Sequence, residues 1–235
     1  MRIGANIILK DGYCYQSYSW NRFRPLGELQ RVIDSLEKYE CDEIAIIRPI
    51  REKDSLDSFR LDIDKLSKVN CMTPISFGGG LRNKDCVKML KGVPIERLIF
   101  SSSFLNKQTD LIDFSQQQFG HQAIQCLLPF IVRNNTIEVY FSQLKKFVNM
   151  KEIDFDYINQ SANEIILYSI KNEGLSNRFE ETIYDVIPID KSKLIITGGI
   201  GKNDIKKAKK HAIASTLIDN KVLHQEYSIK DYKNA

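Results

Sequence analysis

Eight short apolar runs, separated mostly by helical patterns, predict that this chain folds as an α/β protein of the (β/α)8 barrel class. The runs are continuous and not alternating, which is typical of parallel strands covered on both faces. The length of 235 residues suits one such barrel, and no linker rich in Pro, Gly or Ser divides the chain. We therefore expect a single domain over residues 1–235.

The expected strands are distributed along the whole chain. They begin at Ile3, Glu43, Thr73, Arg97, Ala123, Glu164, Lys193 and Ala212. Between them, residues 26–39 repeat apolar side chains at three-to-four spacing, and Asn83 is expected to cap the helix that follows it. After the fifth run we expect a small hairpin with Asn134 and Asn135 as its turn.

Two pairs of similar segments indicate an internal duplication. Residues 77–83 (FGGGLRN) are echoed 120 positions later by residues 197–203 (TGGIGKN). Residues 41–47 (CDEIAII) are echoed 121 positions later by residues 162–168 (ANEIILY). The nearly identical offsets predict two half-barrels, about residues 1–120 and 121–235, so that each glycine loop follows an odd strand, the third or the seventh.

Glycine loops at these places are typical of phosphate binding. Loops at the carboxyl ends of barrel strands form the active face, and backbone amides there bind anions where no Cβ blocks them. Alternatively, each glycine only permits a tight strand-to-helix turn. Two symmetric loops favour a ligand with an anionic group at each end. The expected residues are Gly79, Gly80, Ser101 and Ser102 at one cradle, and Gly198, Gly199 and Lys221 at the other.

Composition indicates a globular protein of the cytoplasm. Hydrophobic residues make up 43% of the chain and charged residues 27%, and the net charge is +4. We interpret the basic run Lys202–Lys210 as the solvated face of a helix and expect no nucleic-acid partner. The five cysteines lack CxxC spacing and suit a reducing compartment, and the first apolar run is too short for a signal peptide or a membrane span.

The histidines do not suggest a metal site. His121, His211 and His224 are too dispersed in the sequence to form a ligand triad. We therefore expect neither a metal nor a cofactor.

Motifs spread over nearly the whole chain resemble the cyclase subunit of imidazole glycerol phosphate synthase, a (β/α)8 barrel of histidine biosynthesis. They are LKDG from Leu9, DEIAII from Asp42, FGGGLRN from Phe77, FGHQ from Phe119, EIILYSIKNEG from Glu164, TGGIGKND from Thr197 and VLH from Val222. That family uses ammonia from a glutaminase subunit to cleave and cyclise a bis-phosphorylated substrate. The resemblance implies phosphate contacts at Gly80, Ser101 and Ser102, and at Glu173, Gly174, Gly199, Asn220 and Lys221.

The family's catalytic carboxylates are not matched. Its two general acid/base aspartates, at the ends of the first and fifth strands, correspond to Ile8 and Pro129, which cannot transfer protons. A third familiar aspartate corresponds to Arg48, and the acidic residue on the sixth strand corresponds to Lys171. The alternative is a local misalignment, with Asp11 as the acid.

The resemblance also implies an ammonia entrance at the opposite face. In the family, four charged residues at the amino ends of alternate strands gate ammonia entry beneath the glutaminase. The matching residues are Arg2, Glu43, Arg97 and Glu164. Salt bridges that only stabilise the fold are the alternative, but four matching charges favour a retained gate and a glutaminase partner in a heterodimer.

These expectations lead to one preferred function and two alternatives. The preferred function is a divergent synthase subunit that uses ammonia on another phosphorylated, acidic substrate, in surface-polysaccharide synthesis of amino or amidino sugars. Arg48 and Lys171 would face this substrate from neighbouring parts of the active face. The alternatives are the histidine-pathway cyclase, with Asp11 or Glu173 replacing the aspartates, and a scaffold that only activates the glutaminase.

Overall fold

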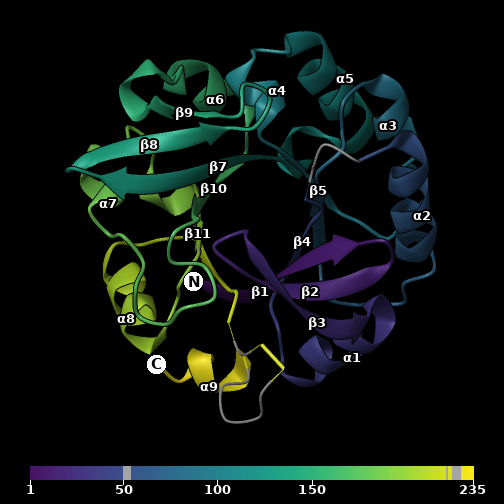
Figure 1. Ribbon diagram of the computed structural model, residues 1–235, viewed down its shortest axis with the longest axis horizontal. Coiled ribbons are helices and arrows are strands. Elements are labelled where there is room, and N and C mark those ends of the chain that lie inside the picture. The colour runs from purple at the N-terminus through teal and green to yellow at the C-terminus, as the bar shows by residue number, and fades with distance from the viewer. Residues whose placement is uncertain (50–53, 221, 224–228) are drawn as a thin grey trace.

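Eight parallel strands in the described part of the chain close into a barrel, as expected (Figure 1). The computed structural model describes residues 1–49, 54–220, 222–223 and 229–235. Neighbouring barrel strands follow the order of the chain, and the β1–β12 and β7–β10 pairs complete the ring. The barrel strands are β1 (Arg2–Lys10), β4 (Ile44–Ile47), β5 (Ile75–Gly78), β6 (Arg97–Phe100), β7 (Ile124–Arg133), β10 (Glu164–Ser169), β11 (Leu194–Thr197) and β12 (Ser215–Ile218).

Helices surround the barrel on the outside (Figure 1). They are α1 (Leu29–Lys38), α2 (Leu56–Ser67), α3 (Lys84–Lys88), α4 (Ser102–Leu105), α5 (Thr109–Phe119), α6 (Phe155–Ser161), α7 (Ile183–Val186), α8 (Lys202–Lys210) and α9 (Ile229–Lys233). The predicted pattern of the first helix is confirmed, because α1 buries Leu29, Val32, Ile33 and Leu36. Asn83 caps α3 as expected, since its side chain accepts a hydrogen bond from the amide of Cys86.

Two apolar cores hold these layers together. The larger one lies between the strands and the helices and includes Ile7, Ile46 and Leu167. A smaller core includes Ile8, Ile47 and Leu217, whose side chains lie on the opposite face of the strands from those of the larger core. Because side chains alternate across a strand, the smaller core fills the barrel interior.

Two three-stranded antiparallel extensions rise from the barrel. β1 continues into β2 (Tyr13–Tyr18) and β3 (Arg22–Glu28), and β7 continues into β8 (Thr136–Phe141) and β9 (Lys146–Asn149). The predicted turn of the second extension is confirmed, because Asn134 and Asn135 have φ values of 49° and 57°. The same sequence of elements, a long strand and then two antiparallel strands, thus begins at the first and at the fifth barrel strand.

Two expected boundaries differ from the structure by three residues. Residues 26–28 belong to β3 and not to the first helix, because β2 supplies ladder partners to this segment. The last barrel strand begins at Ser215 and not at Ala212, because the amides of Ala212 and Ile213 donate back to carbonyl groups of α8.

All five cysteines are free thiols. No described helix combines the length and the apolar character that crossing a membrane requires.

Candidate functional site

The four expected gate residues meet in a closed ring of ion pairs at the amino end of the barrel. Arg2 pairs with Glu43 at 3.1 Å and also with Glu164. Arg97 completes the ring through Glu43 at 3.2 Å and Glu164 at 3.9 Å. These residues come from the first, second, fourth and sixth barrel strands, so the expectation of strictly alternate strands is wrong.

Neighbouring barrel residues hold the two glutamates of this ring. The Ser215 hydroxyl donates to Glu43, and the Gln125 amide donates to Glu164 at 2.9 Å. Gly4 leaves the space for Glu43, because a Cβ at Gly4 would lie 2.7 Å from the Glu43 Cγ. Since Glu43 is 2% exposed and Glu164 7%, the two carboxylates lie inside the protein and their charges are balanced there.

The two glycine loops lie at the opposite, carboxyl end of the barrel and on opposite sides of it. They follow β5 and β11, the third and seventh barrel strands, as the sequence predicts. Gly79 and Gly198 have matching φ values of 99° and 97°. In both loops the neighbouring strand end explains the glycine, since an added Cβ would lie 2.0 Å from the Arg48 carbonyl oxygen or 2.2 Å from that of Ser169. Close backbone packing therefore requires both glycines, whatever they bind.

The first glycine loop lies beside polar atoms that have no hydrogen-bond partner in the described part of the structure. These atoms are the Ser101 hydroxyl and the Nη1 atom of Arg48. A Cβ at Gly80 would lie 3.0 Å from that Nη1 atom, so the guanidinium edge is next to the loop. The Ser102 hydroxyl, in contrast, lies 2.5 Å from the Ser142 hydroxyl. Buried donors without a partner are rare in proteins, which makes this loop a candidate anion site.

Arg48 does not have the expected environment of an unpaired, substrate-facing cation. Its side chain is 2% exposed and forms ion pairs with Asp62, at 2.5 Å, and with Asp54. The Ser58 hydroxyl accepts a further hydrogen bond from Arg48 at 2.9 Å. Burial alone would lower the pKa of Arg48, but the two carboxylates raise it overall. The guanidinium charge is thus neutralised inside the protein, and none of the described residues forms a hydrogen bond with its Nη1 atom.

Asp11 and Lys171 lie apart from each other. Asp11 is in the exposed turn between β1 and β2, where its carboxylate accepts a hydrogen bond from Ser58 at 3.2 Å. Ser58 thereby links Asp11 to Arg48. Lys171 is exposed and follows β10, the sixth barrel strand, whereas Arg48 follows the second. Arg48 and Lys171 therefore lie on opposite sides of the opening, and the expectation of neighbouring positions is wrong.

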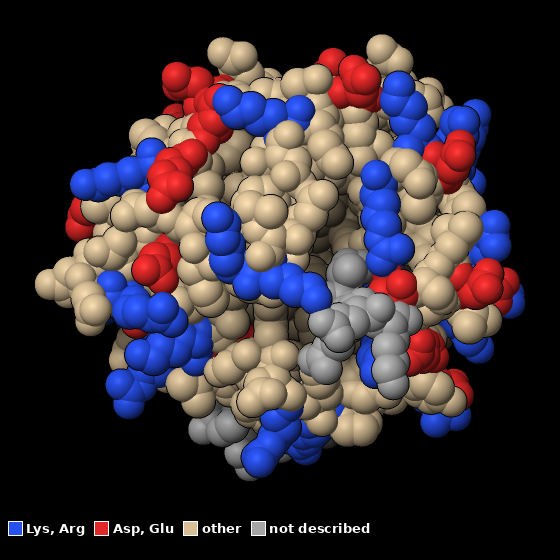
Figure 2. Space-filling model, turned by 45° about the horizontal axis from the view of Figure 1, so that its top comes forward, with Lys and Arg blue, Asp and Glu red and all other residues tan. Residues whose placement is uncertain are grey.

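Lysine and arginine side chains border a hollow on this part of the surface (Figure 2). Figure 2 brings the upper side of Figure 1 forward, so that the face on which the two extensions lie is seen at an angle. Basic side chains around a hollow favour anionic ligands through the local field.

At the second glycine loop, the Gly199 amide and the Gly174 amide of the loop after β10 already share a side-chain acceptor. The Asp219 carboxylate accepts hydrogen bonds from the amide of Gly174 at 2.8 Å and from the amide of Gly199 at 3.1 and 3.2 Å. Asp219 follows β12 and is 3% exposed. Burial raises the pKa of Asp219 to about 7, and the nearby charge of Glu173 also raises it.

Glu173 and Asn220, both expected at the second phosphate, are bonded to the protein itself. Glu173 is 1% exposed and accepts hydrogen bonds from the Ser17 hydroxyl and the Trp20 amide, each at 2.7 Å, and from the Tyr168 hydroxyl. The Asn220 amide donates to two backbone carbonyl groups at 2.6 and 2.8 Å, and its oxygen accepts from Tyr232. These geometries do not agree with direct phosphate contacts by either side chain. Lys221, the remaining expected residue, lies outside the described residues.

The two positions that match the family's acid/base aspartates carry no proton-transfer group in the structure. Ile8 is 2% exposed in the interior core beside Ile47. Pro129 lies in β7 and pairs with Tyr168 of β10. The sequence reasoning missed two nearby polar residues, Tyr168 and Asp219. Their signal was the strand alternation, which directs positions 164, 166 and 168 to one side of β10 and positions 215, 217 and 219 to one side of β12 and the residue after it.

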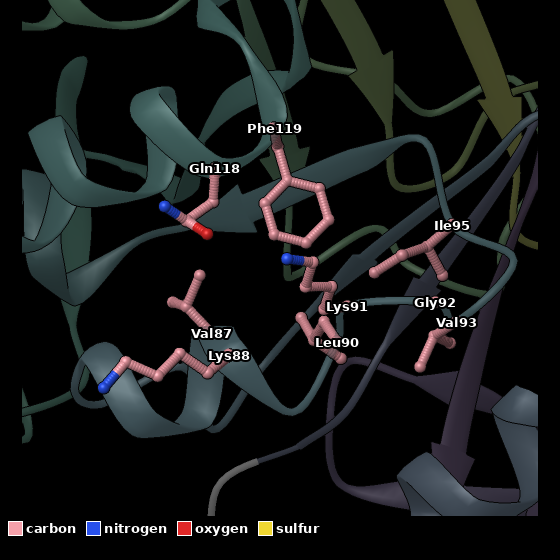
Figure 3. Close-up of a pocket in the computed structure, with 9 residues that line it drawn as sticks. All are labelled: Val87, Lys88, Leu90, Lys91, Gly92, Val93, Ile95, Gln118 and Phe119. Atoms are coloured by element: carbon pink, nitrogen blue, oxygen red, sulfur yellow. The ribbon is translucent and has the colours of Figure 1, made fainter.

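A surface pocket of about 250 Å³ lies between α3, the segment that follows it and the end of α5 (Figure 3). It is bounded by Val87 of α3, by the loop that contains Ile95, and by Phe119 at the end of α5. These residues precede the starts of β6 and β7 on the outside of the barrel, so the pocket is not part of the carboxyl-end site.

The fold and these two ends define a class: a (β/α)8 barrel with a charged ring at its amino end and two opposed glycine loops at its carboxyl end. Residues 2–228 match the model of a family described as "Histidine biosynthesis protein". The chain belongs to this histidine biosynthesis protein family.

Several curated proteins are similar to the chain at low identity. A putative imidazole glycerol phosphate synthase subunit hisF2 of Vibrio vulnificus is 23% identical over 87% of this chain and 75% of the relative. A protein of the same printed name from Campylobacter jejuni is 22% identical over 99% of this chain and 93% of the relative. The imidazole glycerol phosphate synthase subunit HisF of Natranaerobius thermophilus is 22% identical over 99% of this chain and 94% of the relative.

Proposed function

We propose that the chain is the ammonia-using subunit of a glutamine amidotransferase pair and acts on a phosphorylated substrate. The closed ring of Arg2, Glu43, Arg97 and Glu164 is the observation that carries this proposal. A ring of two cations and two anions at the barrel entrance can form polar contacts with ammonia as it enters. The names of the similar proteins, which are synthase subunits, support a partner protein for this chain as well. We propose that the partner is a glutaminase of the HisH type in a heterodimer.

The phosphate of the substrate would bind at the first glycine loop. Gly79, Gly80, Ser101 and Ser102 form this cradle in our proposal, and the free Nη1 edge of Arg48 adds a cationic donor. Lys171 would face the substrate from the other side of the opening, where it is exposed. Asp11 would hold the cluster around Arg48 through Ser58.

The reaction would differ from the ring closure of histidine biosynthesis. Ile8 and Pro129 cannot supply the general acid and base, and each such group contributes about 10²–10⁴ to the rate. We therefore propose a cytoplasmic role in the synthesis of amino or amidino sugars of surface polysaccharides. Growth of a cyclase-deficient strain without histidine, when it carries this chain, would contradict the proposal and favour the histidine pathway.

The proposed glutaminase partner can be tested by measuring whether this chain stimulates glutaminase activity. The glutaminase subunits encoded in the same genome are expressed one by one and mixed with the chain, and glutamate release is measured. We expect one of them to bind and to be stimulated, and Glu164→Gln to reduce the stimulation, because this substitution breaks the ring. Glu181→Gln, which changes an exposed ion pair with Lys207, serves as the control and is expected to have no effect.

The same test distinguishes a non-catalytic scaffold from the proposed ammonia-using subunit. Stimulation by every variant without ligand-dependent consumption of ammonia would indicate a scaffold that only activates the glutaminase. The absence of a complex with every glutaminase subunit would contradict the proposed partner.

A further inference from the structure

The two glycine loops differ in what their donors contact, although their backbones match. At the first loop, the Ser101 hydroxyl and the Arg48 Nη1 atom have no hydrogen-bond partner among the described residues. At the second loop, the amides of Gly174 and Gly199 converge on the Asp219 carboxylate. A carboxylate oxygen that accepts two backbone amides occupies the position that an anionic ligand would take in such a cradle.

Asp219 is fixed in this position by the surrounding structure. The residue is 3% exposed, and the next residue, Asn220, is held by the carbonyl groups of Leu175 and Ile200. Gly174 is also closely packed, because an added Cβ there would lie 2.4 Å from the Tyr18 ring. The carboxylate is thus part of the folded barrel and not of a surface loop.

We propose that Asp219 acts as an internal anion that occupies the second glycine cradle and excludes a phosphate from it. This inference rests on the proposed function and narrows its substrate class. The substrate carries its phosphate at the β5–β6 end only, and the end near β10–β12 bears neutral or cationic groups such as hydroxyls or an amine.

Electrostatic repulsion also disfavours a phosphate at the second glycine cradle. A phosphate at Gly174 and Gly199 would have to displace Asp219 from both amides and would then lie beside two buried carboxyl groups, Asp219 and Glu173. Like charges at close range in a weakly screened interior repel strongly, so a phosphate dianion is disfavoured there. A hydroxyl or an ammonium group can instead donate to these carboxyl groups.

Titration with inorganic phosphate at pH 8 tests the inference, with the backbone amide signals of the full-length protein as the readout. In the wild-type protein we expect the signals of Gly174 and Gly199 to stay unchanged. In Asp219→Ala, the same two signals are expected to move with phosphate, with an affinity at least about tenfold higher than in the wild type, because one like charge and the internal acceptor are gone.

Asp204→Ala is the matched control. Asp204 is also a buried aspartate near this loop, and its carboxylate accepts a hydrogen bond from the Gly201 amide at 2.9 Å, but it does not contact Gly174 or Gly199. We expect this variant to behave like the wild type. Phosphate-dependent shifts of Gly174 and Gly199 in the wild type would overturn the inference, even if Asp219→Ala does not fold. A folded Asp219→Ala that leaves both signals unchanged would overturn it too.

The signals of Gly79 and Gly80 separate this inference from the proposed function. If they do not respond to phosphate in any variant, phosphate binding at the first loop is wrong, whatever happens at Asp219. If they respond while Gly174 and Gly199 also respond in the wild type, the proposed function stands and only the role of Asp219 fails.

Discussion

At the scale of single residues, Arg48 and Asp62 form a buried ion pair in which each charge offsets the free-energy cost of burying the other. Both side chains are nearly inaccessible, with 2% and 1% exposure, and they pair at 2.5 Å. Phe59 adds a cation–π contact with the guanidinium at 5.5 Å. Removing one member of such a pair leaves an uncompensated charge in the interior, which is far more costly than losing an exposed pair.

Arg48→Met is therefore expected to lower the free energy of unfolding by about 3–5 kcal/mol. Arg82→Met is the control, because Arg82 binds the same Asp54 but is 47% exposed, and its loss is expected to cost less than about 1 kcal/mol. Urea unfolding of the two variants measures both values. Equal losses would mean that the Arg48 pair is not buried in solution.

The raised pKa of Asp219 predicts that the stability of the protein depends on pH. Its pKa is about 7 in the folded protein, against 3.8 as the ordinary value, so folding favours the protonated form. The contribution of Asp219 to stability is complete below pH 3.8 and is lost as the pH rises to 7. The lost stability is on the order of 4 kcal/mol, at about 1.4 kcal/mol for each unit of the pKa shift.

We expect the difference in unfolding free energy between Asp219→Asn and the wild type to grow in favour of the variant between pH 4 and pH 8. The amide side chain stays neutral over this range, whereas the wild-type carboxyl must ionise beside Glu173 and near Tyr168. Denaturant unfolding at several pH values gives this difference directly. A difference that does not change with pH would show that Asp219 titrates normally.

At the scale of elements, the glycine loops show how strand ends are packed. Gly79 has a positive φ and also lies against the Arg48 carbonyl group of the neighbouring strand end. Gly92, in contrast, has a φ of +83° but no heavy atom within 4 Å of an added Cβ. A comparison of alanine substitutions at Gly79 and Gly92 therefore distinguishes the cost of steric overlap from the cost of backbone strain.

Gly79→Ala is expected to cost more than about 4 kcal/mol, since the strand ends must move apart. Gly92→Ala is expected to cost roughly 1–2 kcal/mol, the usual penalty of a side chain in the left-handed region. Urea unfolding again provides the measurement. Similar losses in both variants would mean that the loop after β5 adapts to a side chain.

Elements that depend on local pattern were predictable, whereas the first antiparallel extension was not. The barrel strands and the Asn134–Asn135 turn follow from apolar runs and from residues that accept positive φ. The turn that joins β2 to β3 instead uses Ser19 and Trp20 with φ values of 52° and 56°, and neither residue type indicates such a turn. Helical spacing in residues 26–39 then concealed the end of β3.

At the scale of the whole molecule, the site depends on contacts between distant segments. The sequence motifs correctly grouped Arg2, Glu43, Arg97 and Glu164, because their positions at strand starts determine where they meet. The partners of Arg48 and the internal role of Asp219 depend on how α2 and the loop after β10 pack, which no local pattern encodes. Prediction therefore succeeded for charges placed at strand starts and failed for side-chain contacts made by α2 and by the loop after β10.

The rates at which the cysteine thiols react are expected to show whether the whole barrel unfolds as one unit. Cys14, Cys41, Cys86 and Cys126 are buried in different parts of the fold, and burial raises the pKa of Cys14 and of Cys41 to about 12. We expect native protein at pH 8 to react slowly with a thiol reagent, with Cys71 first because it is only partly buried. Cys71→Ser should remove that first phase, and the other four thiols should react together at the rate of unfolding. A second rapid thiol would show that one part of the barrel opens alone.

The unequal glycine loops also give the opening of the barrel a direction. Two equivalent cradles on opposite sides of the opening would let a ligand with two similar ends bind in either of two orientations. With Asp219 seated at Gly174 and Gly199, the ends of the opening are no longer interchangeable. In our proposal the ligand therefore presents its phosphate toward β5, and a single carboxylate gives the opening one binding orientation.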